Sequence, residues 1–257
     1  MPQFLISESF WTAASAIAAF IALVLSQLPP IRTYFGNKKP LLTTAPVIGI
    51  SHYLGAPNIQ LYINIENESP KPLKIKKISM MVERYGEQII ELQAYTVFEK
   101  IDSNIQKIFT PFTIRPETDW GNNVSFYTPF VGDKEQKIKE IQYKIRKSIN
   151  SKRAQLQITE ENNLKATNQL LIADEDNVKD AMDFYYENRF WETRDYSIKL
   201  KIITDSPETS VELDFSFFLN SIEKNELDEI ADRYKYGATL MFPDSNAWVF
   251  PWIRKPK

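Results

Sequence analysis

The chain has 257 residues, of which 25% are charged and 43% hydrophobic, and its 31 basic and 33 acidic residues leave a formal net charge of −2. It holds no cysteine, one histidine and only 7 glycines, which excludes disulfides, thiolate metal sites, a cysteine nucleophile and a glycine-rich phosphate loop. A chain of this length can bury a substantial hydrophobic core.

The first predicted element is an uncharged apolar segment at residues 10–28. At about 1.5 Å per residue, a helix of this length approaches the ~30 Å hydrocarbon core of a bilayer. The pattern predicts a retained transmembrane helix, with an extracytoplasmic tail at 1–9 and a juxtamembrane linker at 29–46. A cleaved signal peptide is disfavoured because no Lys or Arg precedes Phe10. A buried helix of a soluble domain is disfavoured because residues 16–25 have no polar side chain.

The flanks of this segment predict its orientation. Lys and Arg near a span are retained on the cytoplasmic side, and here they follow the segment rather than precede it. The chain is therefore expected to cross a bacterial inner membrane once, with its C-terminal domain in the cytoplasm. Small residues spaced four apart also favour association of identical transmembrane helices into a homo-oligomer. The alternative is that these alanines have no role in association, because alanine is common in membrane helices. The predicted anchor residues are Trp11, Ala14, Ala18, Ala22, Arg32, Lys38 and Lys39.

Beyond the linker, the sequence changes to the two-residue period of β-strands. Apolar and polar residues alternate at 59–65, 196–202 and 211–219, and further strand patterns lie at 89–98, 105–114 and 124–130. In residues 73–82 the apolar positions change parity at Lys76 and Lys77, which indicates a β-bulge. About seven strands separated by turns predict an immunoglobulin-like β-sandwich at 47–257. The fold class is therefore mainly β with α.

A helical insertion at about 133–194 is predicted to interrupt this sandwich. Asp133 and Gln136 have the spacing of a capping box, and a second helix is predicted from Asp174 to Trp191. A third helix is predicted at 225–236, after the insertion. Isoleucines at helical spacing form one face of the first helix: Ile138, Ile141, Ile145 and Ile149.

The first helix of the insertion is strongly basic within an acidic protein, with eight basic and three acidic residues at 133–153. Such a helix predicts contact with anionic lipid, nucleic acid or an acidic partner. Nucleic acid is disfavoured, because the apolar side of the helix is a row of isoleucines without aromatic rings for base stacking. The alternative is that the isoleucines pack on the sandwich and the basic residues are solvated. The candidate contact residues are Lys137, Lys144, Arg146, Lys147, Lys152 and Arg153.

Catalytic patterns are weak. His52 has no partner pattern and is expected to be structural, while the S-x-x-K spacing of Ser221 and Lys224 is short enough to arise by chance. The acidic residues from Asp174 to Asp180 lack the glycine and terminal glutamate of a calcium-binding EF-hand loop. The sequence therefore predicts no enzyme, no cofactor and no metal site.

The C-terminal residues 236–252 are rich in aromatic side chains, and Pro251 confines their last strand to a sheet edge. This edge either binds a partner segment by strand addition or closes the core. The predicted function is a non-enzymatic, membrane-tethered interaction or sensor module that binds an unknown protein or a small ligand. Two alternatives stay open: an oligomerising membrane effector of a bacterial defence or toxin system, and a periplasmic, envelope-facing binding domain.

Overall fold

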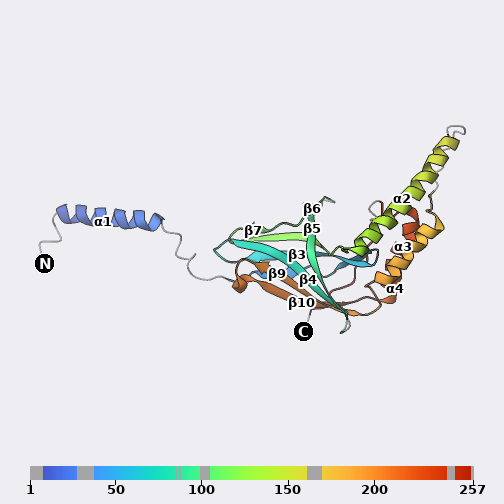
Figure 1. Cartoon of the computed structure of the whole chain (residues 1–257). Coiled ribbons are helices and arrows are strands. Elements are labelled where there is room, and N and C mark those ends of the chain that lie inside the picture. The colour runs from blue at the N-terminus through green and yellow to red at the C-terminus, as the bar shows by residue number, and fades with distance from the viewer. Residues whose placement is uncertain are drawn as a thin grey trace.

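The computed structural model describes residues 8–27, 38–84, 86, 88–98, 105–160, 170–241 and 247–255. Within these ranges, ten antiparallel strands form one sheet that is nearly closed into a barrel, and the helices at residues 133–160, 175–188 and 221–232 gather at one end of it (Figure 1). The fold is therefore mixed, with both strands and helices.

The elements have the following bounds. The strands are β1 (Leu41–Thr44), β2 (Gly49–Tyr53), β3 (Ala56–Asn67), β4 (Leu73–Arg84), β5 (Gln88–Phe98), β6 (Gln106–Ile108), β7 (Phe112–Ile114), β8 (Thr118–Tyr127), β9 (Asp195–Thr204) and β10 (Val211–Phe218). The helices are α1 (Glu8–Gln27), α2 (Asp133–Glu160), α3 (Glu175–Asn188), α4 (Ser221–Asp232) and the short 3₁₀ helices η3 (Pro207–Thr209) and η4 (Arg233–Tyr236).

The sheet is continuous because β5 pairs with a different strand along each half of its length. The strand order is β1-β3-β8-β5-β4-β9-β10, with β2 beside β3, β6 beside β5 and β7 beside β4. Residues 88–93 of β5 pair with β4, and residues 94–97 pair with β8. The C-terminal segment, residues 247–255, then bridges β2 at Ile50 and β10 at Ser216. It thereby links the two ends of the sheet.

These pairings correct the predicted immunoglobulin-like sandwich of two separate sheets. Alternation of apolar and polar residues shows which face of a strand is buried, and that pattern is the same in a sandwich and a barrel. It does not show that one strand changes partners along its length. The bulge predicted in β4 is confirmed by a register shift against β9 between Ile75 and Lys77.

The predicted linker at 29–46 contains strand β1, which pairs with β3 over its whole length. The sequence LLTT is short, and its side chains are alternately exposed and half-buried, so its alternation is too weak to recognise. The insertion predicted between strands corresponds to α2 and α3, which follow β8 and precede β9. The capping box lies at α4 instead, where Asn220 and Glu223 satisfy each other's backbone N–H groups.

The described residues form two hydrophobic cores. The barrel core fills the inside of the sheet and includes Ile59, Leu61, Ile63, Met80, Phe126, Leu200 and Phe217. The helical core lies between α2, α3 and the end of α4, and consists of Leu54, Ile138, Ile141, Ile145, Ile149, Ala173, Ala181, Phe184, Tyr185, Ala231, Tyr234 and Leu240. The isoleucine stripe of α2 therefore packs on other helices rather than on a sandwich.

The turn between β2 and β3 joins the sheet to the helical core. It inserts Leu54, which is completely buried, and continues through Gly55 at φ +91°. A Cβ at Gly55 would lie 2.7 Å from the carbonyl carbon of Asn188, at the end of α3. Glycine is therefore required there both by the positive φ and by the close approach of the helix.

Helix α1 exposes large apolar side chains, including Trp11, Ile17 and Phe20 at 60–66%. Of the described residues in α1, none belongs to either core. Over the parts of the chain that the structure describes, no helix is long and apolar enough to cross a membrane. The predicted transmembrane helix is therefore not confirmed.

Candidate ligand-binding groove

A groove lies on the outer face of the sheet, and the alternation of β3 and β8 builds its floor. Ile59 of β3 and Val124 of β8 are completely buried inside the barrel. Their neighbours Asn58, Gln60 and Ser125 therefore point outward. In the ladder, Gln60 lies directly opposite Ser125, so these polar side chains form one continuous surface.

A β-bulge in β5 adds two adjacent residues to the same face. Ala94 pairs with Phe126 and Thr96 pairs with Ser125, so that Tyr95 is an extra residue without a partner in the ladder with β8. A bulge redirects side chains and is common beside binding sites. As a result, Tyr95 and Thr96 both line the groove although they are consecutive in the sequence.

The groove has a volume of about 310 Å³ and combines a polar floor with aromatic walls. This volume is at the lower end of the ~300–1,000 Å³ that small-molecule pockets occupy. Tyr53 enters from the end of β2, and Trp248 from the C-terminal segment. The lining residues are Tyr53, Asn58, Gln60, Tyr95, Thr96, Gln106, Ser125, Tyr127 and Trp248.

Two polar atoms of the floor have no hydrogen-bond partner among the described residues: Asn58 Oδ1 and Ser125 Oγ. Ser125 is only 5% exposed. Its hydroxyl is therefore withdrawn from bulk solvent without any compensating protein contact, an arrangement that costs free energy. Thr96 Oγ1 donates to Gln106 Oε1 at 2.8 Å, which fixes the Gln106 carboxamide beside these atoms.

Two tyrosines of the walls, Tyr53 and Tyr127, stay neutral at physiological pH. Burial raises the pKa of Tyr127 to about 12, with Tyr53 and Tyr95 adding to the shift. Burial also raises the pKa of Tyr53, against the opposing effects of Gln142 and Arg146. Both of these phenols can thus donate a hydrogen bond from the walls of the groove.

This groove was not predicted from the sequence, although one of its features leaves a signal. In β5, Ile90, Leu92 and Ala94 occupy even-numbered positions and Val97 an odd-numbered one, although Ile89 and Phe98 are apolar at the opposite parity. The same change of parity predicts the bulge in β4, so it could have revealed the bulge at Tyr95. No local pattern shows that Tyr53 and Trp248 come to the same place, because they lie 195 residues apart in the sequence.

The structure gives several of the basic residues on α2 partners within the protein. Lys144 pairs with Asp180 of α3 at 2.8 Å, and Lys152 with Asp174 at 2.7 Å. Their hydrogen bonds raise the pKa of Lys144 and lower the pKa of both carboxyl groups. Lys147 lies 5.9 Å from the centre of a tyrosine ring on its own helix. These contacts make Asp174 and Asp180 partners of α2.

The other predicted basic contacts are Lys137, which is half-buried, and Arg146 and Arg153, which are exposed. Their contact with lipid, nucleic acid or a partner stays a prediction.

The predicted anchor residues lie on or near α1. Lys38 pairs with Glu68 at 3.9 Å, Lys39 is exposed, and Arg32 lies outside the described residues. On α1, Ala14 is half-buried, and Ala18 and Ala22 are exposed.

His52 is buried in a chain of hydrogen bonds that joins the two cores. The Leu54 N–H donates to the Tyr234 hydroxyl, which lies 3.1 Å from His52 Nδ1, and His52 Nε2 lies 2.8 Å from the Leu227 carbonyl oxygen. A carbonyl can only accept, so Nε2 carries the proton and Nδ1 accepts from Tyr234. Burial lowers the pKa of His52 to about 4. All its hydrogen bonds are thus made within the protein.

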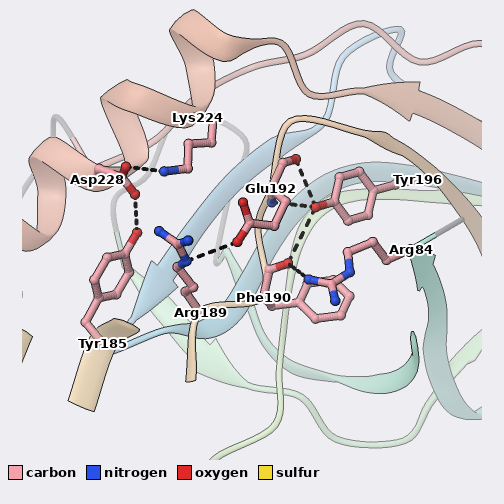
Figure 2. A network of polar contacts seen from close by, with 8 residues as sticks. All are labelled: Arg84, Tyr185, Arg189, Phe190, Glu192, Tyr196, Lys224 and Asp228. Atoms are coloured by element: carbon pink, nitrogen blue, oxygen red, sulfur yellow. Dashed lines mark hydrogen bonds and ion pairs between the residues drawn. The ribbon is translucent and has the colours of Figure 1, made fainter. Parts of the chain in front are cut away.

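A second polar network joins the end of α3 to β4, β9 and α4 (Figure 2). The Tyr196 hydroxyl accepts from the Glu192 N–H at 2.7 Å, and Arg84 donates to the Phe190 carbonyl at 3.3 Å. Arg189 pairs with Glu192 at 3.0 Å. These contacts fix the connection between α3 and β9, so we interpret this network as a structural joint.

The S-x-x-K pair does not form a nucleophile with its base. The Lys224 ammonium donates to Asp228, which also accepts from the Tyr185 hydroxyl at 2.6 Å (Figure 2). Ser221 is exposed at the start of α4. The described residues include no group of three or more histidine and acidic side chains arranged to hold a metal ion.

No protein-family model matches the sequence, and no curated protein matches it either. Among solved structures, a crystal structure of a protein from Archaeoglobus fulgidus is similar over 69% of this chain and 98% of that chain, with 8% identity and a TM-score of 0.28. A likeness this weak carries no argument about function, so the groove has to be interpreted from its own chemistry.

Proposed function

We propose that this chain is a non-enzymatic binding module, tethered to a membrane, whose barrel takes up a small ligand in the groove. The observation that carries the proposal is the pair of unpartnered polar atoms, Asn58 Oδ1 and Ser125 Oγ, beneath aromatic walls. Burial of these two atoms without hydrogen bonds costs free energy in the folded protein. A ligand that hydrogen-bonds to both atoms would remove that cost. Apolar walls with a few convergent polar groups are the usual composition of a small-molecule site.

The ligand proposal is tested by purifying the full chain from cells and identifying the small molecules that it releases on denaturation by mass spectrometry. Trp248→Ala removes one wall of the groove. Trp252→Ala is the matched control, because Trp252 lies on the same C-terminal segment, is 71% exposed and does not line the groove. We expect wild type and Trp252→Ala to retain the same compound and Trp248→Ala to lose it. Equal release by all three proteins would contradict the proposal.

The tether is proposed on the apolar surface of α1. Ile17, Phe20 and Leu23 are each at least 60% exposed, and insertion of such side chains into a bilayer is favourable. The full chain is expected to remain with membranes after a carbonate wash, and the double variant Ile17→Lys, Phe20→Lys to enter the soluble fraction. Wild-type protein in the soluble fraction would overturn the tether without affecting the groove.

The orientation is proposed from the basic residues that follow α1, which favour a cytoplasmic barrel in a bacterial inner membrane. The cysteine-free chain allows a single reporter, such as Tyr143→Cys on the exposed side of α2. Protection of this cysteine from an impermeant maleimide until lysis is expected. Labelling in intact cells would support the periplasmic alternative. Homo-oligomerisation through the alanines of α1, and the effector function that depends on it, stay predictions.

A further inference from the structure

We propose that the ligand of the groove is an uncharged saccharide, an inference that rests on the proposed binding function. Three properties of the groove lead to this class: the absence of charge in its lining, the mutual orientation of its rings, and the hydrogen-bonding capacity of its floor.

The lining contains no Lys, Arg, Asp or Glu among the described residues. Recognition of a phosphate or carboxylate group generally relies on Arg, Lys or a helix N-terminus. Recognition of an ammonium group generally relies on a carboxylate. Transfer of a charged group to a half-enclosed site without such a partner is costly. The groove therefore favours an uncharged compound over nucleotides, sugar phosphates and amino acids.

The aromatic rings meet edge to face. The ring centres of Tyr53 and Tyr127 lie 6.5 Å apart at an interplanar angle of 88°, and those of Tyr95 and Tyr127 lie 5.8 Å apart at 72°. Neither of these two ring contacts is stacked. A ring face carries partial negative charge, which attracts the weakly positive C–H groups on one side of a sugar ring. The aromatic walls therefore suit the C–H face of a sugar ring.

The floor has the donors and acceptors that hydroxyl groups require. Asn58, Gln60 and Gln106 are carboxamides, each with an acceptor oxygen and two N–H donors, and Thr96 and Ser125 are hydroxyls. A sugar hydroxyl both donates and accepts, so it can satisfy the acceptor Asn58 Oδ1 and pair with Ser125 Oγ. The groove also holds about 310 Å³, a volume suited to a mono- or disaccharide.

The inference is tested by calorimetric titration of the full chain in detergent with glucose, N-acetylglucosamine and maltose. Adenosine serves as an uncharged planar competitor, and glucose 6-phosphate and glucuronate as charged sugars. We expect saturable binding of at least one neutral sugar, and binding at least tenfold weaker for its charged counterpart and for adenosine.

Two variants show whether binding uses this groove. Trp248→Ala should weaken sugar binding at least tenfold, whereas Trp252→Ala should leave it unchanged. Ser125→Ala should weaken it by a similar factor without lowering the melting temperature, because the hydroxyl has no partner in the folded protein. A residue with only a structural role would show the reverse, a lower melting temperature with unchanged affinity in the protein that remains folded.

Failure of this inference is distinguishable from failure of the proposed function. If the chain releases a compound in a Trp248-dependent manner but binds none of the neutral sugars, the saccharide class is wrong and ligand binding stands. Preference for adenosine or for a charged sugar would also overturn the saccharide class. If no compound is released and no sugar binds, both proposals are wrong.

Discussion

The two cores of this protein are held together by different interactions. The barrel core consists of aliphatic and aromatic side chains, and Ile59, Ile63 and Phe126 are completely buried in it. The helical core borders a polar chain in which Tyr234 and His52 depend on each other's hydrogen bonds. Apolar packing is independent of pH, whereas a buried histidine contributes to stability only while it remains neutral. We therefore expect the stability of the fold to depend on pH through His52, beside the helical core.

The largest effect is expected from loss of volume in the barrel core. Phe126→Ala should reduce the free energy of unfolding by about 3–5 kcal/mol, because it removes buried apolar surface and leaves a cavity. Denaturant titration followed by circular dichroism measures this loss. The control Val131→Ala changes a side chain that is 79% exposed and should have almost no effect. A loss below ~1 kcal/mol for Phe126→Ala would show that the barrel is not tightly packed there.

In the helical core, removal of a single hydroxyl oxygen should lower the free energy of unfolding almost as much. Tyr234→Phe keeps the ring but leaves both the Leu54 N–H and His52 Nδ1 without partners. Buried unsatisfied groups cost about 1–3 kcal/mol, so we expect a loss of roughly 2–3 kcal/mol in the same titration. Tyr143→Phe, on an exposed tyrosine of α2, should be neutral. Equal stability of the two variants would contradict the hydrogen-bond chain.

The pH dependence of stability should separate the two cores. The pKa of His52 is lowered from 6.5 to about 4 by burial, which outweighs the opposing effects of the Leu227 hydrogen bond and of Asp228. The unfolded chain therefore binds a proton below pH ~6.5 that the folded chain does not, and stability falls as the pH decreases towards 4. Between pH 7 and 5 the loss should be roughly 2 kcal/mol.

His52→Gln should flatten this dependence, although the variant itself is less stable. The carboxyl groups with lowered pKa values, such as Asp174 and Asp180, contribute only at more acidic pH, so the interval from 7 to 5 isolates the histidine. An unchanged slope in His52→Gln would assign the pH dependence to another group.

The smallest effect is expected at the surface of the helical end. Lys144→Gln removes the pair with Asp180, but both side chains are more than one third exposed, and such pairs add little to stability. The melting temperature should be unchanged at 0.15 M salt. A clear decrease would show that charge contacts between α2 and α3, and not only the isoleucine stripe, hold the helical core together.

The sequence predicts the parts of this fold that repeat locally. Alternation locates β3, β9 and β10, and helical spacing identifies the isoleucines of α2 as buried. It does not reveal that β5 pairs with two different strands or that the C-terminal segment bridges β2 and β10, because these pairings join distant residues. For the same reason the groove escapes prediction. Of its features, the parity change beside Tyr95 leaves a local signal, whereas the convergence of Tyr53 and Trp248 depends on the tertiary fold.

The most direct test of the groove uses the tryptophans as reporters. The chain has 5 of them, and Trp248 is the one that lines the groove. After incorporation of 5-fluorotryptophan, ¹⁹F spectra of the full chain are recorded with increasing concentrations of the compound that the wild-type protein retains. The Trp248 resonance should shift saturably, while those of Trp191 in the barrel core and the exposed Trp252 stay in place. A shift of either of these with Trp248 unchanged would show that the ligand binds elsewhere.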